Sequence, residues 1–260
     1  FSVLSLVVTF AGCYRGKDDV PHISGASSSG AGGGQGSGSA SASNAASSSG
    51  SGAGGMMPVD PCAKSIFCDD FEGYPAGAPQ GGKWGNNQST GSVAVDTGRA
   101  HSGKNAVKVT ADAAAGYRSA MISLSDPSVL PVAGNVLYGR MMFYLESAPT
   151  GTVHWTFIDG SGPIQGQNYH SVYRYGGQVP ITQNNMFVGS QLMANYETPD
   201  FYQSPPVGPG SDCWFHSNKK VVPVGAWTCV EWEFDGPKNA MHFWLGGTEL
   251  TDLAVSAMGQ

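Results

Sequence analysis

Residues 152–178 bring several side chains capable of chemistry close together in the chain. The segment reads TVHWTFIDGSGPIQGQNYHSVYRYGGQ and includes His154, Gln165, Asn168, His170, Tyr173, Arg174 and Tyr175, while Arg118 precedes it. Imidazole and phenol groups transfer protons, and guanidinium and amide groups donate hydrogen bonds to anions. The segment therefore predicts a reaction centre or a binding surface for polar molecules, unless it is the polar face of an ordinary hairpin.

Alternation along a strand divides these side chains between two faces. Over residues 170–176, His170 and Arg174 share one face, whereas Tyr173 and Tyr175 lie on the other. A hydrophobic core does not account for a row of polar groups. We expect one groove lined by Arg118, His154, His170 and Arg174. The two tyrosines would then lie in the core or donate from the rim.

The surrounding sequence predicts short strands and few helices. Runs rich in Val, Phe, Tyr and Trp alternate with turns of Gly, Pro, Asn and Asp. In residues 228–235 (TCVEWEFD), Val230, Trp232 and Phe234 share one face, and a hairpin loop follows at KNA. This pattern predicts an all-β, two-sheet antiparallel sandwich. Residues 178–222, rich in proline and aromatic residues, are predicted to form long structured loops.

Composition divides the chain into three parts. Residues 24–55 are Ser, Gly or Ala apart from Gln35 and Asn44, so they have almost no apolar surface to bury and are predicted to be a disordered tether. Residues 1–13 (FSVLSLVVTFAGC) resemble the apolar part of a secretory signal, and FAGC resembles a lipoprotein cleavage box that would lipidate Cys13. The alternative is a plain apolar tail. We predict a signal remnant at 1–13, a linker at 14–59 and a globular domain at 60–260 that lacks one or more C-terminal strands.

Charge and cysteine content narrow the class of protein. Charged residues make up 12% of the chain and the net charge is −6, which argues against a nucleic-acid partner. We expect an exported monomer, either secreted or held at the outer membrane or cell surface by a lipid anchor alone. Excluding Cys13, an even number of cysteines remains, which favours disulfides in an exported domain. Three pairings are possible, and the local one is our prediction: Cys62–Cys68 and Cys213–Cys229.

Three segments resemble a known family. They are CDDFEGYPAG with the later AHSGKNAVKV, then TVHWTFIDGSG with YHSVYRYGG, and finally GAWTCVEWEFDGPKNAMHFWLGG. They resemble the concanavalin-A-like jelly-roll domains of secreted polysaccharide lyases. The similarity is greatest to the cellulose-induced fungal protein family and its relatives near the glucuronan and alginate lyases. The resemblance implies a jelly roll that engages polysaccharide. If the protein is an enzyme, the resemblance implies that it cleaves an acidic polysaccharide.

The resemblance also implies a β-elimination mechanism. Such a lyase neutralises the sugar carboxylate, removes the adjacent proton and protonates the leaving oxygen. Arg118 and Arg174 would neutralise the carboxylate, His154 or His170 would be the base, and Tyr173 or Tyr175 the acid. Gln165, Asn168, Trp155 and Trp214 would contact the sugar. The chain departs from the alginate-lyase pattern because Ala120 and Ile122 stand where charged residues are expected.

A structural calcium ion is a further implication of the resemblance. Glu72, Ser102 and Asn105, with Asp70 as an additional ligand, would supply the oxygen atoms that this cation requires. The alternative is that these are solvated polar residues of a strand and an ordinary turn.

Three other functions remain open. A non-catalytic carbohydrate-binding protein would use Trp84, Trp155 or Trp214 to stack on sugar rings. A glycoside hydrolase would use Glu231 and Glu233, which share a strand face at a spacing of about 6.5–7 Å. A structural or adhesive protein of the cell envelope would need neither site.

Overall fold

The computed structural model describes residues 5–9, 62, 64–111, 118–149, 151, 153–164, 166–183 and 186–256. For residues 5–9 and a few positions within other strands, only the backbone is described. Cys13, the linker at 14–59 and Gln165 lie outside the described residues.

The larger sheet joins strands from both ends of the chain. Its order is β13-β12-β11-β6-β1-β4-β3, with β14 paired to β12, and the pairs are antiparallel. Its strands are β1 (Ser5–Thr9), β3 (Gly91–Asp96), β4 (Ala106–Ala111), β6 (Val136–Leu145), β11 (Thr228–Asp235), β12 (Ala240–Leu245), β13 (Thr248–Glu249) and β14 (Val255–Ser256). The strand β1 therefore lies within the range predicted to be a signal remnant.

The smaller sheet has four strands in the order β10-β9-β8-β7. They are β7 (Trp155–Pro163), β8 (His170–Gln183), β9 (Met186–Glu197) and β10 (Asp212–Val221), and a separate ribbon pairs β2 (Trp84–Asn87) with β5 (Met121–Leu124). The prediction of loops over residues 178–222 is wrong for most of that range. The sequence of β9 does not alternate between apolar and polar residues, because neighbours on opposite faces, such as Met193 and Ala194, are both fully buried.

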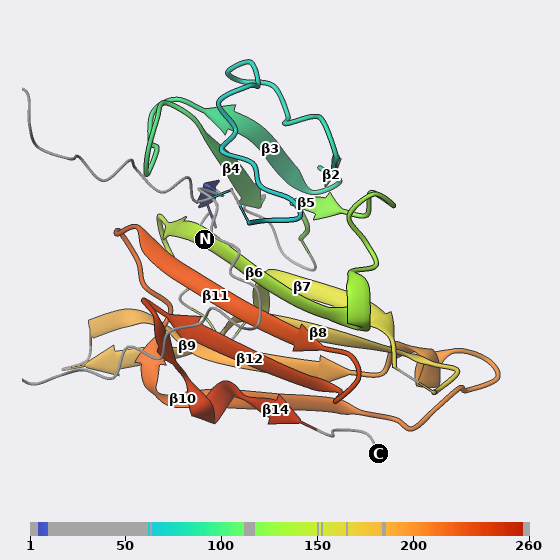
Figure 1. Cartoon of the computed structure of the whole chain (residues 1–260). Helices are drawn as coiled ribbons and strands as arrows, with labels where there is room; N and C mark the ends of the chain where they lie inside the picture. Colours follow the sequence, from blue (N-terminus) through green and yellow to red (C-terminus); the bar gives the residue numbers. More distant parts are fainter. Residues whose placement is uncertain are drawn as a thin grey trace, which may run out of the picture.

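The two sheets pack face to face as an antiparallel sandwich of the jelly-roll type, which confirms the predicted fold class. Figure 1 shows β11 and β12 lying over β8 and β9. The shared core includes Phe143, Phe234 and Phe243 of the larger sheet, which pack against Tyr175 and Leu192 of the smaller one. Val230 and Trp232 lie on the same core-facing side of β11 as Phe234, as the alternation predicts.

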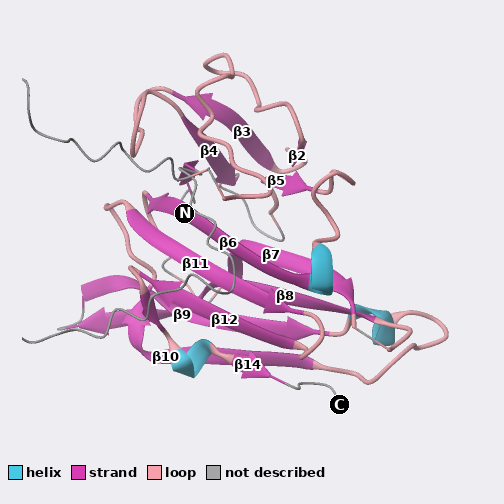
Figure 2. Ribbon diagram, in the orientation of Figure 1, coloured by secondary structure: helices cyan, strands magenta, loops and turns pink. Residues whose placement is uncertain are grey.

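Helical structure is confined to short turns in the described parts of the chain (Figure 2). These are the 3-10 helices η1 (Ala133–Asn135), η2 (Pro199–Tyr202) and η3 (Thr251–Leu253). None of the described helices is long and apolar enough to cross a bilayer.

Asn239 joins the two sheets from the hairpin between β11 and β12. Its amide accepts a hydrogen bond from Tyr173 Oη at 2.7 Å and donates one to Tyr196 Oη at 2.9 Å. The residue is 1% exposed and its φ is +48°, a left-handed conformation that asparagine tolerates better than most residues. The predicted turn at KNA is therefore confirmed, and it also links the sheets.

Two glycines in β8 make room for Trp155. A side chain at Gly176 would come within 1.9 Å of the Trp155 carbonyl oxygen, and one at Gly177 would meet the indole ring at 2.7 Å. The indole is 7% exposed and belongs to the core. The glycine pair in YRYGG thus serves packing.

A second, smaller core lies outside the sandwich, between the opening segment and strands β3 and β4. It contains Phe71, Val93, Val107 and Val109 and is flanked by Tyr74 and Trp84. Asp69 holds the two flanking rings, because its carboxylate accepts hydrogen bonds from Tyr74 Oη at 2.7 Å and Trp84 Nε1 at 2.9 Å. Trp84 is therefore a packing residue, which does not support its expected role in stacking on sugars.

The cysteines follow the prediction only in part. Cys62 and Cys68 form the expected disulfide, with Cα atoms 5.6 Å apart. Cys213 and Cys229 do not form one. The second predicted pairing is wrong because Cys229 alternates with the core-facing Val230 and so lies on the outer face of the larger sheet, away from β10. The Sγ atom of Cys229 instead accepts a hydrogen bond from Arg140 Nε at 2.9 Å.

Candidate functional site

The outward face of the smaller sheet carries the densest group of polar side chains related to the sequence predictions. Residues that pair across neighbouring strands share a face. One cross-strand row contains Asp159, Arg174, Asn195 and Trp214, and the next contains Thr156, Gly176, Met193 and His216. We call this surface the polar face; it also includes His154, Gln178, Glu197 and Asp212.

Two imidazoles on the polar face are joined through one amide. Gln178 Nε2 donates to His154 Nε2, and His216 Nε2 donates to Gln178 Oε1. In this arrangement His154 carries its proton on Nδ1 and His216 keeps an acceptor lone pair on Nδ1. We call these three residues the imidazole–amide trio. Their hydrogen bonds fix the tautomer of both rings.

Trp214 packs beside the trio from an edge strand of the sheet. Its ring centroid lies 3.8 Å from that of His154, with an angle of 38° between the planes. Trp214 is on β10 and His154 precedes β7, and these are the two edge strands of the sheet. Their side chains therefore meet above the two central strands, and the indole lies directly beside the His154 imidazole.

Burial keeps His216 in its neutral form. Desolvation, and secondly the electrostatic effect of the nearby His154 imidazole, lower the pKa of the His216 imidazole from its ordinary value of 6.5. A neutral imidazole with an available lone pair can act as a base near neutral pH.

Charged side chains occupy the row next to the trio. Arg174 Nη1 donates to Glu197 Oε2 at 2.5 Å and to Asn195 Oδ1 at 2.7 Å. Asn195 Nδ2 in turn donates to Asp212 Oδ1 at 2.9 Å. The guanidinium is thus fixed in position, and the part of its fork that these bonds do not use can bind an anion.

Asp159 lies across from Arg174 on β7. Desolvation raises the pKa of its carboxyl group, and the charge of Arg174 opposes that rise. The side chain nevertheless keeps an exposed surface. Asp159 therefore presents a solvent-accessible carboxyl group beside Arg174 on the polar face.

The structure does not support the predicted roles of the two tyrosines. Tyr173 is 5% exposed and its hydroxyl is bound to Asn239, while Tyr175 is fully buried with its hydroxyl 3.5 Å from the Leu253 carbonyl oxygen. Both rings point into the core because their strand positions alternate with the polar face. Neither can protonate a sugar.

Two residues of the predicted groove lie elsewhere. His170 starts β8, eight residues before Gln178, which corresponds to about 26 Å along a strand. Arg118 lies three residues before β5, and the adjacent Ser119 is hydrogen-bonded to Thr90, which directly precedes β3. The expectation of one groove with His154, His170 and Arg118 together is wrong, because the chain positions that approach His154 in space are those of Gln178 and His216.

The predicted sugar contacts also divide. Trp214 lies on the polar face, whereas Trp155 is a core residue and cannot stack on a ligand. Asn168 is exposed in the turn between β7 and β8, at the end of the sheet away from the trio.

Two of the predicted calcium ligands, Glu72 and Asn105, meet at one turn. Glu72 Oε1 accepts hydrogen bonds from the backbone N–H groups of Lys104 and Asn105 at 2.7 and 2.8 Å, and these bonds lower the pKa of the carboxyl group. Asn105 Nδ2 donates to the Phe71 carbonyl oxygen at 3.0 Å. Asp70 Oδ1 accepts only from the nearby Glu72 N–H in the bonds described. Within the described residues, no group of three or more His, Cys, Asp or Glu side chains could hold a metal.

The possible glycosidase pair lies on the outer side of the larger sheet. Glu231 is 3.5 Å from Arg140, and Glu233 accepts a hydrogen bond from Tyr138 Oη at 2.7 Å. Each carboxylate therefore has a structural partner on β6.

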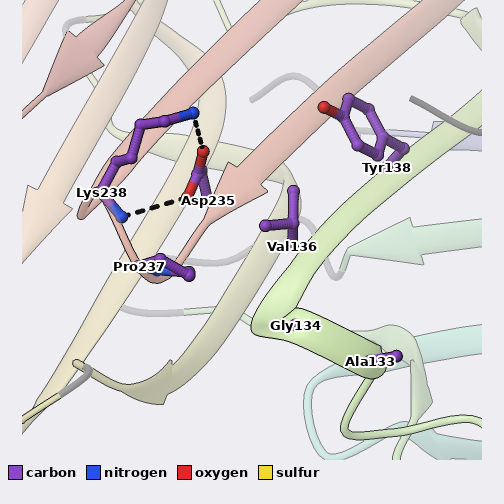
Figure 3. Close-up of a pocket in the computed structure, with 7 residues that line it drawn as sticks. All are labelled: Ala133, Gly134, Val136, Tyr138, Asp235, Pro237 and Lys238. Atoms are coloured by element: carbon purple, nitrogen blue, oxygen red, sulfur yellow. Dashed lines mark hydrogen bonds and ion pairs between the residues drawn. The ribbon is translucent and has the colours of Figure 1, made fainter. Parts of the chain in front are cut away.

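A shallow pocket of about 390 Å³ opens at the end of the larger sheet (Figure 3). It is lined by Ala133, Gly134, Val136, Tyr138, Asp235, Pro237 and Lys238. Lys238 Nζ is bound to Asp235 at 2.6 Å, so the charge in this pocket is already neutralised. The polar face is the stronger candidate.

Sequence reasoning missed Gln178, His216, Asp159, Asn195 and Glu197. Gln178 could have been found by extending the alternation of His170 and Arg174 by two more steps along β8. His216, Asn195 and Glu197 were hidden because β9 and β10 were predicted to be loops. Asp159 was hidden because a β-bulge between Thr156 and Ile158 shifts the alternation of β7. In β10, the alternation of Asp212, Trp214 and His216 is present in the sequence.

The fold and the polar face define a class of protein: a jelly-roll sandwich that presents imidazoles, an arginine and an aromatic ring on one sheet. Residues 82–260 match the family described as polysaccharide lyase-like, Cip1-like, core domain. The chain therefore belongs to this family, which confirms the resemblance seen in the sequence. It is also similar to a solved structure, "Cellulose induced protein, Cip1", with 20% identity over 68% of this chain and 72% of that chain and a TM-score of 0.42. No curated protein matches it.

Proposed function

We propose that the protein binds an acidic polysaccharide on the polar face and cleaves it by β-elimination. The observation that carries the proposal is the imidazole–amide trio with Trp214 beside it. Trp214 would stack on the apolar face of a sugar ring, and Arg174 would neutralise the sugar carboxylate.

The proton transfer follows from the hydrogen bonds of the trio. His216 Nδ1 would take the proton from the carbon next to the carboxylate, and the electrons of that C–H bond would form the new C=C bond. The C–O bond to the leaving sugar then breaks, and its oxygen takes a proton from water. The hydroxide that remains takes the proton from His216, which restores the neutral base. Gln178 would hold His216 in the tautomer that this step requires.

The test is to incubate the protein with glucuronan, alginate and pectate and to follow the ultraviolet absorbance of unsaturated uronate products. We expect product from the wild type and loss of product from His216→Ala. His242→Ala is the matched control, since His242 lies on the larger sheet and is bound to Glu249 at 2.8 Å. Equal rates in both variants and the wild type would refute the assignment of the base.

Binding without cleavage is the second candidate, and the state of Arg174 favours it. The guanidinium is already paired with Glu197, and the two additional charged residues of the alginate-lyase pattern are replaced by Ala120 and Ile122. A wild-type protein that is retarded by polysaccharide in affinity gels but releases no unsaturated product would be such a binder.

We also propose that the protein is exported and anchored through Cys13. The Cys13 sequence context and the Ser/Gly-rich segment behind it support this proposal. A lipoprotein signal would be cleaved off before Cys13 and would take Ser5–Thr9 with it. In the structure these residues form β1 of the larger sheet. The lipidated protein and the protein that contains β1 are therefore alternatives. The mass of the mature N-terminal peptide decides between them: a lipidated Cys13 supports the anchor, and an intact N-terminus refutes it.

A structural calcium ion held by Glu72 and Asn105 is proposed as well, with Ser102 and Asp70 as further oxygen donors. The convergence of Glu72 and Asn105 on one turn supports it. The ion would have a structural role alone: it would join the turn at residues 102–105 to the segment that contains Asp70 and Glu72.

A further inference from the structure

A cluster of exposed aromatic and polar side chains lies at the end of the smaller sheet opposite the trio. The segment at η2 carries Phe201 and Tyr202, which are 38% and 62% exposed. Their ring centroids are 5.4 Å apart at an angle of 88°, so the edge of one ring meets the face of the other. Exposed aromatic rings held in a fixed geometry are typical of ligand-binding surfaces.

Polar groups adjoin these rings. His170 Nδ1 lies 2.8 Å from Asp200 Oδ2, and the His170 backbone N–H donates to the same oxygen at 2.7 Å. Gln203 Nε2 donates to Asp200 Oδ1 at 2.7 Å. The His170 side chain remains 57% exposed, while that of Asp200 is 14% exposed. Asp200 therefore orients an accessible imidazole and an accessible amide beside the aromatic pair.

The segment is held rigidly although it lies at the surface. Thr198 is fully buried, its N–H donates to the Ser211 carbonyl oxygen at 3.0 Å, and its Oγ1 accepts from the Ser211 N–H at 2.9 Å. Gly210 packs so closely on Phe201 that a side chain there would meet the ring at 2.7 Å. A ligand would therefore meet rings that are already ordered, which reduces the entropy cost of binding.

We propose that His170, Asp200, Phe201, Tyr202 and Gln203 form a second carbohydrate subsite, which we call the distal subsite. The Tyr202 ring takes the apolar face of a pyranose, and His170 and Gln203 bind its hydroxyl groups. His170 shares its strand face with Arg174 and Gln178, so the distal subsite continues the polar face. The inference rests on the proposed function, because the occupant is a further part of the same polysaccharide chain.

The spacing determines which ligands can use both subsites. His170 and Gln178 are about 26 Å apart along β8. A di- or trisaccharide is too short to span that distance, whereas a polymer can contact both ends. The distal subsite therefore selects for long chains and leaves the binding of short fragments to the trio and Trp214.

The test compares the Tyr202→Ala and Trp214→Ala variants by titration calorimetry with polymeric and trimeric glucuronan, alginate and pectate. We expect Tyr202→Ala to weaken polymer binding about three- to tenfold and to leave trimer binding unchanged. Trp214→Ala should weaken both. Tyr202→Phe keeps the ring and should bind the polymer as the wild type does, and equal melting temperatures show that the variants are folded.

The outcomes separate this inference from the proposed function. If Trp214→Ala weakens polymer binding and Tyr202→Ala does not, the distal subsite is overturned and the proposed function stands. If the wild type binds none of the polymers or trimers, both are overturned. Equal losses of trimer binding in the two variants would also overturn the distal subsite, because a trimer cannot reach it from the trio.

Discussion

The imidazole of His154 and the indole of Trp214 lie 3.8 Å apart between ring centroids, although they come from opposite edges of a four-stranded sheet. At a strand spacing of about 4.8 Å, those edges are separated by about 14 Å in a flat sheet. The two side chains therefore reach toward each other over β8 and β9. Below them, Gln178 ties His154 to His216.

This contact predicts a specific loss when the indole is removed. Trp214→Ala takes away both a stacking surface for sugar and the ring that packs on His154, so we expect polysaccharide affinity to fall about tenfold. Affinity electrophoresis measures the change. Trp244→Ala is the matched control, because Trp244 pairs with Glu231 on the larger sheet and should leave affinity unaltered. Equal losses in both variants would contradict the location of the site.

The lowered pKa of His216 predicts a pH dependence of stability. In the unfolded chain this imidazole takes up a proton near pH 6.5, whereas in the folded protein desolvation delays protonation to lower pH. The contribution of neutral His216 is therefore complete above about pH 6.5 and is lost as the pH falls through the folded pKa. We expect the melting temperature of His216→Gln to fall less steeply than that of the wild type as the pH is lowered below about 6.5. An unchanged slope in calorimetric scans would contradict this.

The Asn239 bridge predicts a measurable loss of stability. Asn239→Gly keeps the left-handed backbone but deletes both hydrogen bonds to Tyr173 and Tyr196, so the free energy of unfolding should fall by about 1–3 kcal/mol. Asn239→Ala should lose more, because it adds strain at φ +48°. Urea denaturation measures both. If alanine is the better tolerated of the two, the backbone argument is wrong.

The calcium proposal predicts a response to chelation. We expect removal of divalent cations to lower the melting temperature of the wild type and added calcium to restore it. Glu72→Gln should be less stable and should no longer respond to calcium. Glu146→Gln is a control, because Glu146 contacts Arg99 and Lys108 on the surface and should keep the wild-type response. If chelator leaves the wild-type melting temperature unchanged, the calcium proposal is wrong.

The cysteine arrangement predicts a labelling pattern. After denaturation without reductant, an alkylating reagent should modify Cys213 and Cys229 and leave Cys62 and Cys68 unmodified until reductant is added. Peptide mass mapping reads the result directly. A disulfide-linked peptide containing Cys213 and Cys229 would show that the larger and smaller sheets approach each other differently in solution.

Much of the fold is visible in local patterns. Val230, Trp232 and Phe234 predict which side of β11 is buried, and the spacing of Cys62 and Cys68 predicts their bridge. Both follow from short-range geometry, since side chains alternate along a strand and six residues can fold back on themselves. The same reasoning separates Arg174 from Tyr173, although it does not say which of them faces the core.

The composition of the candidate site was decided by tertiary structure. His154 and His170 are closer in sequence than His154 and His216, yet the strand order β10-β9-β8-β7 brings His216 to His154 and carries His170 to the other end of β8. Strand pairing places residues by register and not by distance along the chain. The sequence by itself determined an all-β protein and the kinds of side chain available for chemistry. Only the packed sheet decided which of them meet, because that depends on hydrogen-bonded partners far apart in the chain.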